Sequence, residues 1–381
     1  MDKLSAKFEE LFGSEQAPKT YFCPGRVNLI GEHIDYLGGL VMPTAISLGI
    51  TALYQTNNSS TIRIHSIDFE ETLSLDLNSL PNSKQNLWSD FVLGVVLHLR
   101  EMGVELGGCD ILISSNLPKG AGLSSSAALE VLCYFMFHSV FAGTEPDRIK
   151  MALHCQKIEN NFIGVNCGIM DQFAVANGTT GHAVVLNCDT LEHEFAPLNL
   201  GKYSLVIINT NKPRALAESA YNKRRKECDL ALKTISNYKP ISNLVDATLN
   251  DLELLNEPVV RKRAKHAITE QLRVEQSAEA LLAGDLKHFG KLMTESHHSL
   301  KDDFEVSCNE LDYIVTKLIS EPSCLGARMT GAGFGGCCIA LVATTALVNI
   351  RSLITKSYKD QFGFEPSVYT CVSSNGVQEI I

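Results

Sequence analysis

The sequence predicts an α+β fold of two domains, and three observations support this prediction. The chain has 381 residues, which exceeds the size at which a single hydrophobic core stops growing. Strand-like runs come early in each half, with helices intermixed rather than in a regular βαβ array. A polar segment at 190–201 separates two buried strand-like runs. We therefore expect one domain at 1–195 and another at 196–381.

The elements of the first half follow from hydrophobic periodicity. Residues 71–77 alternate apolar and polar side chains, as a half-buried strand does. Residues 126–143 are apolar nearly all round, so this helix should be buried. On the same grounds, helices are expected at 4–12, 87–103, 126–143 and 146–162, and strands at 50–55, 61–66, 71–77, 109–116 and 182–189.

The second half begins with a buried strand-like run at 203–210 and is then mostly helical. Two apolar runs near its end, at 335–342 and 367–372, predict strands around one more helix. The other helices are expected at 214–237, 258–283, 286–300 and 308–320.

Composition and charge exclude several classes of function. The formal net charge is -10 and there is no long basic run, which argues against nucleic acid as a partner. No uninterrupted apolar stretch reaches about 18 residues, and the charged N-terminus does not resemble a signal peptide. The 12 cysteines form no CxxC pair, so free thiols in a reducing compartment are expected. These features predict a cytoplasmic protein without a membrane partner.

The stretch "PKGAGLSSSAALEV" at 118–131 has the context of a phosphate-binding loop. A strand-like run precedes it and a helix follows. Gly120 and Gly122 permit positive φ, so successive N–H groups can converge on one anion. A Walker loop would carry Lys after its last glycine, whereas Lys119 precedes both. The serines can cap the helix or bind Mg²⁺, and an ordinary capped helix start explains the loop equally well.

A second glycine-rich stretch, "GAGFGG" at 331–336, formally satisfies GxGxxG. A dinucleotide site needs a strand before this motif and a helix after it. The residues that follow are strand-like instead, which argues against such a site. The glycines still indicate that the backbone lies close to another segment or a ligand.

The stretch "PGRVNLIGEHIDYLGG" at 24–39 is unusually dense in polar side chains. Burying them is costly without a ligand or a complete hydrogen-bond network, and acceptors mixed with donors suit sugar hydroxyls. A metal site from Glu32, His33 and Asp35 is an alternative, although adjacent Glu and His point apart on a strand. Asp171, the single acid of "NCGIMDQFAVANG", is either a structural cap or a base for phosphoryl transfer.

Four colinear motifs resemble those of one kinase superfamily. "GRVNLIGEHIDY" resembles the galactokinase signature, and "LPKGAGLSSSAALEV" resembles the ATP loop of the GHMP kinases. "CGIMDQFA" and "MTGAGFGGC" resemble their catalytic-aspartate segment and C-terminal glycine motif. The resemblance implies an N-terminal domain like domain 2 of ribosomal protein S5 and a C-terminal ferredoxin-like α/β domain. The active site is then expected in the cleft between them.

The resemblance also implies roles for residues. Asp171 would be the base near the anomeric hydroxyl, and Arg26 would lie beside the transferring phosphoryl. The implied sugar-binding residues are Glu32, His33, Asp35, Gly168 and Tyr221. The implied nucleotide-binding residues are Ser66, Gly120, Ala121, Gly122, Leu123, Ser124, Ser125 and Ser126. Ser126 and Glu159 would bind Mg²⁺.

The function implied is ATP- and Mg²⁺-dependent phosphorylation of α-D-galactose at O1, which gives galactose 1-phosphate and ADP. Ile34 stands where many galactokinases have threonine, so a kinase for N-acetylgalactosamine or L-arabinose is an alternative. A galactose sensor without turnover is a further one, although the serine loop and Asp171 are intact. The sequence does not determine the oligomeric state, and a monomer is the working expectation.

Overall fold

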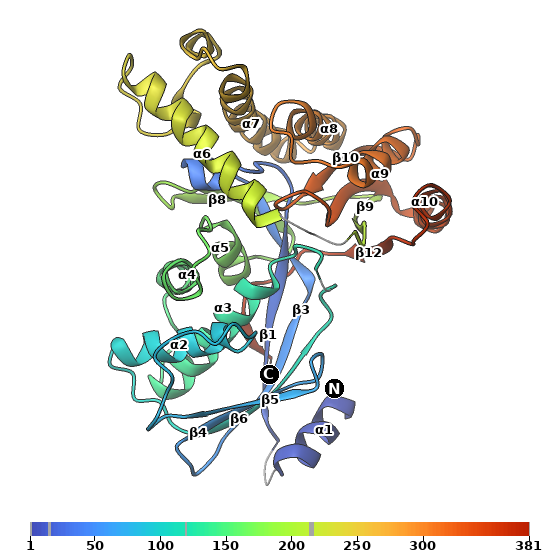
Figure 1. The fold of residues 1–381 in the computed structure, drawn as a ribbon. Helices are drawn as coiled ribbons and strands as arrows, with labels where there is room; N and C mark the ends of the chain where they lie inside the picture. Colours follow the sequence, from blue (N-terminus) through green and yellow to red (C-terminus); the bar gives the residue numbers. More distant parts are fainter. Residues whose placement is uncertain (1, 14–16, 119, 213–216, 381) are drawn as a thin grey trace.

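The structure, a computed structural model, describes residues 2–13, 17–118, 120–212 and 217–380. Lys119 lies outside the described residues. Figure 1 shows the N-terminal half below, in blue and green, and most of the second half above it, in yellow to red. Both chain ends lie in the lower body, so the last residues return to the half in which the chain begins.

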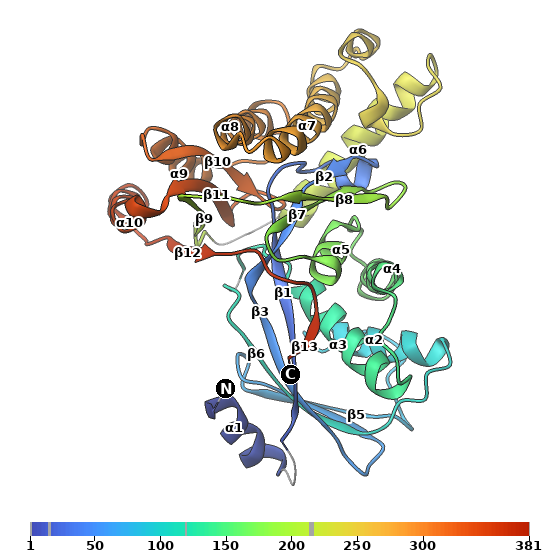
Figure 2. The ribbon, with the colours of Figure 1, turned by 180° about the vertical axis from the view of Figure 1, so that it is seen from behind.

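The largest sheet belongs mainly to the first half. Its strands are β1 Lys19–Asn28, β3 Pro43–Thr56, β4 Thr61–Ser66, β5 Glu71–Asp76, β6 Cys109–Ser115 and β13 Gln378–Ile380. They lie in the order β13-β1-β3-β6-β4-β5, with β4 and β6 parallel and the other neighbours antiparallel. The helices of this half are α1 Asp2–Phe12, α2 Asp90–Glu101, α3 Ser125–Phe141, α4 Arg148–Ile158 and α5 Met170–Asn177. Helices α2 to α5 cover one face and α1 lies on the other (Figures 1 and 2).

The second half contains an antiparallel sheet in the order β10-β11-β9-β12. Its strands are β9 Tyr203–Asn209, β10 Cys324–Thr330, β11 Cys337–Ala343 and β12 Ser367–Cys371. Its helices are α6 Ala217–Ser236, α7 Pro258–Leu282, α8 Leu286–Asp302, α9 Asn309–Ile319 and α10 Leu347–Phe362. Helices stand between the first two strands and between the last two, with a direct β10–β11 connection. This is the βαββαβ order of the predicted ferredoxin-like domain.

A small third sheet, in the order β2-β7-β8, lies between the two bodies (Figure 2). Its strands are β2 Leu40–Val41, β7 His182–Asn187 and β8 His193–Pro197. Helix α7 of the second half packs against β2 and β8. A division at 195/196 therefore remains a proposal, because β8 spans it and β13 returns across it.

The short helical segments also follow the chain. They are η1 Asp35–Leu37, the π-helical turn η2 Glu159–Ile163, η3 Leu244–Asp246, η4 Leu249–Leu254 and η5 Thr344–Ala346. The helix expected at 146–162 is thus regular only to Ile158 and then widens into η2. Such π-turns are frequent at functional sites.

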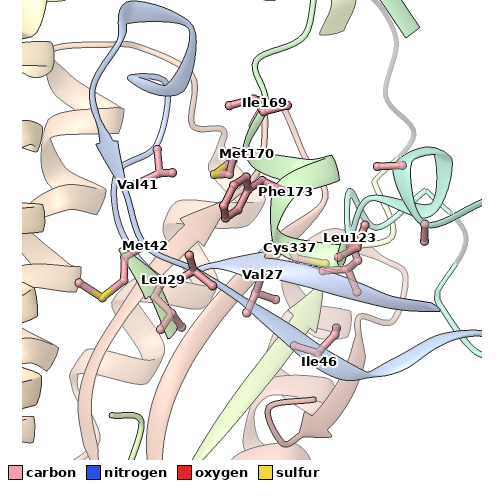
Figure 3. Close-up of a cluster of buried hydrophobic side chains, with 14 of the residues drawn as sticks. Val27, Leu29, Val41, Met42, Ile46, Leu123, Ile169, Met170, Phe173 and Cys337 are labelled. Carbon is pink, nitrogen blue, oxygen red and sulfur yellow. The ribbon is translucent and has the colours of Figure 1, made fainter. Parts of the chain in front are cut away.

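The hydrophobic core is continuous from one half into the other. Figure 3 shows Val27 of β1, Ile46 of β3, Leu123, Phe173 of α5 and Cys337 at the start of β11 in one cluster. Each of these side chains is at most 3% exposed. Interiors of this kind are close-packed, so the cluster fixes the relative positions of the segments that carry it.

Most predicted elements are present, and the buried helix at 126–143 is confirmed as α3, which is buried from Ala127 to Phe137. The sequence pattern missed β1, β2, β8, β10, β13 and α5. Strand β1 has no alternation because its last six residues are all buried, including Arg26 and Asn28. None of the helices in the described part of the chain combines the length and apolarity that a membrane crossing requires.

Candidate active site

A cavity of about 390 Å³ lies where the two halves meet. It gathers side chains from β1, from the 29–39 loop, from the segment before α5 and from α6. Eight of the predicted site residues line it, namely Arg26, Glu32, His33, Asp35, Glu159, Gly168, Asp171 and Tyr221. The structure thus brings together the predicted catalytic and sugar-binding residues and one predicted metal ligand.

Arg26 and Asp171 form an ion pair in the lining of this cavity. Arg26 Nη2 and Nε lie 2.7 and 2.8 Å from Asp171 Oδ1, and Nη1 donates to the Gly122 carbonyl at 2.9 Å. Ser124 Oγ donates to the other carboxylate oxygen at 2.6 Å. The Arg26 side chain is 5% exposed and that of Asp171 30%. The carboxylate is therefore held from one side and open toward the cavity on the other.

Local structure explains why these groups meet. Asp171 lies in the first turn of α5, where the helix dipole favours a negative charge. The register of β1 against β3 shifts between Pro24 and Arg26. At Gly25 an added Cβ would lie 2.7 Å from the Leu123 carbonyl oxygen. The absence of a side chain at this position lets the serine loop approach β1.

Glu32 and His33 are held rigidly in the cavity wall. Arg328 Nη2 donates to the Glu32 carboxylate at 2.9 Å. Burial lowers the pKa of His33 to about 3, so the ring is neutral. Its Nε2 donates to the Ala332 carbonyl at 3.2 Å, and Nδ1 accepts from the Tyr36 hydroxyl at 3.1 Å.

Asp35 packs directly against Gly168 in the cavity wall. A Cβ at Gly168 would lie 2.7 Å from Asp35 Cγ, so only glycine permits this approach. Burial, together with the charges of Asp171 and Glu32, raises the pKa of Asp35 to about 7. A carboxyl in such a site gains from a hydroxyl that donates to it. The Tyr221 ring completes the wall, with its centroid 5.6 Å from that of His33.

A second cavity, of about 220 Å³, lies beside the start of α3. Its lining includes Ser66, Ser125 and Ser126 of the predicted nucleotide site. Phe69 and Trp88 also line it, with their rings stacked at 5.7 Å and 10°. An apolar slot next to a loop of backbone N–H groups suits a flat, phosphate-bearing ligand.

The serine loop differs in one respect from the sequence interpretation. Ser124 is the N-cap of α3 with φ +62°, but its side chain makes no cap hydrogen bond. Its hydroxyl is bonded to Asp171 instead. Gly120 and Gly122 have positive φ as expected. Ala121 and Leu123 are buried, so this part of the loop can offer a ligand its backbone rather than its side chains.

Ser126 and Glu159 fit a Mg²⁺ site in the chemistry of their donors. Ser126 Oγ lies 3.5 Å from Glu159 Oε1, and Gln172 Nε2 donates to Glu159 Oε2 at 2.6 Å. Burial and the nearby Asp171 charge raise the pKa of Glu159 to about 7. A bound cation would offset this by stabilising the ionised carboxylate. Within the described residues, no group of three or more His, Cys, Asp or Glu could hold a metal. Mg²⁺ needs only one or two carboxylates when phosphates supply the other oxygens.

Comparison with known proteins identifies the family. Family models match as "Galactokinase galactose-binding signature" at 6–56, "GHMP kinases N terminal domain" at 90–179 and "GHMP kinases C terminal" at 277–360. The galactokinase of Clostridium tetani is 41% identical over 384 residues, covering 100% of this chain and 98% of that protein. That of Staphylococcus carnosus is 42% identical over 387 residues, covering 100% and 99%. The chain belongs to the galactokinase family.

Solved structures agree with this family assignment. Lactococcus lactis galactokinase, solved in complex with galactose, has a TM-score of 0.95 at 38% identity, covering 100% of this chain and 99% of that one. Methanococcus jannaschii mevalonate kinase has a TM-score of 0.69 at 22% identity, covering 95% and 100%, which shows the fold alone. The predicted galactokinase resemblance, two-domain GHMP kinase fold and ATP-dependent sugar kinase are confirmed at the level of the family.

Some residues of this candidate site were missed in the sequence. Gln172, which holds Glu159, directly follows Asp171, and its position beside a candidate base could have drawn attention to it. Phe69 and Trp88 carry no local pattern that links them to the serine loop. Ala332 lies in the glycine stretch that was expected to lie close to another segment or a ligand, and its carbonyl accepts from His33.

Proposed function

We propose that the protein transfers the γ-phosphoryl group of ATP to O1 of α-D-galactose, giving galactose 1-phosphate and ADP. One observation carries this proposal. Asp171 lines the first cavity, while its carboxylate is bonded to Ser124 of the loop that leads into the second. A base at this junction lies between a site for a sugar and a site for a nucleotide.

Residues of the first cavity bind the sugar in this proposal. Asp35 and Glu32 accept hydrogen bonds from sugar hydroxyls, and Tyr221 packs against the ring. Gly168 leaves room for Asp35. This role is supported by the burial of Glu32 and His33 at 2% and 3% exposure, because buried polar groups in fixed positions discriminate between hydroxyl arrangements.

Asp171 acts as the base or orients the anomeric hydroxyl for attack. Its two carboxylate oxygens have different fixed partners, Arg26 and Ser124. The side of the carboxylate that faces the cavity is left for the substrate. The guanidinium of Arg26 stabilises the charge that develops on the transferring phosphoryl. Phosphoryl transfer requires this kind of positioning and charge neutralisation more than covalent chemistry.

The second cavity and the serine loop receive ATP. Ser66, Phe69 and Trp88 line the slot for the adenine base of ATP. The 120–126 backbone faces the phosphates at the start of α3. Ser126 and Glu159 would hold Mg²⁺, which supplies charge neutralisation at phosphate oxygens when it is bound.

A panel of sugars in an ADP-release assay tests the proposal. We expect turnover with galactose to exceed that with N-acetylgalactosamine and L-arabinose. Ile34, which suggested an alternative sugar, is 0% exposed and does not line the cavity, so it offers the sugar no contact. Turnover of another sugar without galactose would assign a different substrate, and galactose binding without ADP release would indicate a sensor.

A further inference from the structure

Helix α7 of the second half packs behind the 29–39 loop, and two of its side chains hold one residue of that loop. Glu270 Oε1 accepts from the backbone N–H groups of Gly31 and Glu32 at 2.9 and 3.2 Å. His266 Nε2 donates to the Glu32 carbonyl at 3.0 Å. The two side chains are four residues apart, so they project from the same face of the helix.

Glu32 is therefore held at three points. Its N–H bonds to Glu270, its carbonyl bonds to His266, and its carboxylate bonds to Arg328 at 2.9 Å. Both α7 residues are 0% exposed, and neither is among the residues that line the cavity. Their hydrogen bonds to the site thus go to the backbone of the loop, and the Phe304 ring also contacts both the His266 and the His33 rings, with centroids 4.6 and 4.9 Å away.

The next residue explains why such a hold is needed. His33 has a φ of +63°, a left-handed conformation that non-glycine residues rarely adopt. Strained backbone persists where the surrounding structure fixes it on several sides. The peptide carbonyl held by His266 lies directly before His33. This hydrogen bond therefore fixes the orientation of the peptide group that precedes the strained residue.

The chemistry of the two α7 side chains suits this task. Burial opposes ionisation of Glu270, but the charge of Arg273 and other neighbours lowers its pKa to about 2, so the side chain accepts with both oxygens. Burial lowers the pKa of His266 to about 4, so the neutral ring donates through Nε2 and accepts from Ser299 through Nδ1.

We propose that His266 and Glu270 are positioning residues for the sugar site, which hold the peptide groups of Glu32 so that Glu32 and His33 face the cavity. The inference rests on the proposed function, because it assigns the cavity to galactose. It adds two residues that contact neither substrate but determine the affinity for galactose and not the affinity for ATP.

The test measures galactose and ATP kinetics in Glu270→Ala. We expect the KM for galactose to rise at least about tenfold, since two buried N–H donors lose their acceptor. The kcat and the KM for ATP should stay within about threefold, because the two N–H groups that lose their acceptor both lie in the 29–39 loop. Glu270→Gln should recover most of the affinity, since its carboxamide oxygen can still accept while Arg273 turns toward solvent. Glu279→Ala, on the exposed side of α7, is the matched control.

ATP binding serves as a separate check that each variant is folded. Trp88, the only tryptophan of the chain, lines the second cavity, so its fluorescence reports ATP binding independently of the sugar. His266→Leu, which fills the buried volume without a donor, tests the same inference if Glu270→Ala does not fold; its galactose KM should also rise about tenfold or more.

Two outcomes would overturn the inference: an unchanged galactose KM in a folded Glu270→Ala or His266→Leu variant, or equal losses of galactose and ATP affinity. A wild-type chain that phosphorylates no galactose would instead overturn the proposed function on which the inference rests.

Discussion

The two sides of the active site differ in how far their polar groups are already bonded within the protein. On the sugar side, Glu32 and His33 are almost fully buried and each has fixed partners. On the nucleotide side, Gly120 and Ser125 are exposed and Ser126 is half-buried. Among the residues that the structure describes, the Ser126 hydroxyl makes one hydrogen bond, a long one of 3.5 Å to Glu159.

This difference indicates two ways of building affinity. A wall whose groups are fixed before binding loses little entropy and rejects a ligand with the wrong hydroxyl pattern. A loop whose N–H groups converge on an open space is completed by the phosphates and the cation that enter it. Substitutions on the sugar side should therefore act by displacing neighbours, and those on the nucleotide side by removing single contacts.

Asp171 lies at the boundary between the two sides, and its substitution should have the largest effect. In Asp171→Asn we expect kcat to fall about 10³-fold, within the range of a positioned general base. The affinity for galactose should change by less than about threefold, because the other wall residues stay in place. ADP release and calorimetric titration with galactose measure the two quantities.

Asp189→Asn, an exposed position, controls for the loss of one charge. A kcat within tenfold of the wild type would remove Asp171 from the chemistry. It would also contradict the placement of Asp171 at the boundary between the sugar side and the nucleotide side, since the two cavities would then no longer share a reacting group.

Gly168 tests whether the sugar wall is fixed. In Gly168→Ala the new Cβ would lie 2.7 Å from Asp35 Cγ, so the carboxyl must move. We expect the KM for galactose to rise by about 30-fold or more, because a displacement of about 1 Å in a site can cost 10²-fold. The KM for ATP should not change. Gly201→Ala, in an exposed turn with nothing within 4 Å of the new Cβ and a φ of +53°, controls for the backbone strain that an added Cβ causes away from the cavity. An equal galactose KM in both variants would show that the wall adapts.

The difference between the two sides also explains how much of the site could be predicted from the sequence. Contiguous motifs located Glu32, His33 and Asp35, and the resemblance assigned them to the sugar. Their partners could not be found in this way, since Arg328 and Glu270 are distant in sequence and only the fold brings them to the 29–39 loop. Strand β1 was missed for a related reason, because its buried polar residues remove the alternation that reveals a strand.

The nucleotide side was easier to recognise in outline than in detail. The glycines of the serine loop have the positive φ that was expected. Capping of the helix by a serine side chain was one of two open interpretations, and Ser124 does not cap it, because a long-range contact with Asp171 takes its hydroxyl. Phe69 and Trp88 carry no motif, and their stacking next to the loop follows from tertiary packing alone.

The pH dependence of galactose use should report Asp35. Burial and the charges of Asp171 and Glu32 raise its pKa to about 7, so the group is mostly protonated at pH 6 and mostly ionised at pH 8. The ionised form is the better acceptor for a sugar hydroxyl. At saturating ATP and Mg²⁺, kcat/KM for galactose should therefore rise about tenfold from pH 6 to pH 8, as expected when the enzyme–ATP complex that has not yet bound galactose titrates.

Asp35→Asn should flatten this profile, since the amide does not titrate. The same slope in that variant would assign the transition to another group and would remove the carboxylate of Asp35 from sugar recognition.

Ser126 should give the smallest effect, and it tests the nucleotide side of the comparison. Ser126→Ala removes one hydroxyl from a loop that a cation and phosphates complete, so the remaining oxygens can compensate. We expect the Mg²⁺ concentration for half-maximal activity to rise about fivefold, the equivalent of one hydrogen bond of about 1 kcal/mol. The KM for galactose should stay constant, and Ser125→Ala, one residue earlier and more exposed, should leave the Mg²⁺ requirement unchanged. Equal Mg²⁺ requirements in both variants would mean that Glu159 holds the cation without this serine. A rise in the galactose KM of Ser126→Ala would mean that the two sides are coupled and that the nucleotide loop helps to shape the sugar wall.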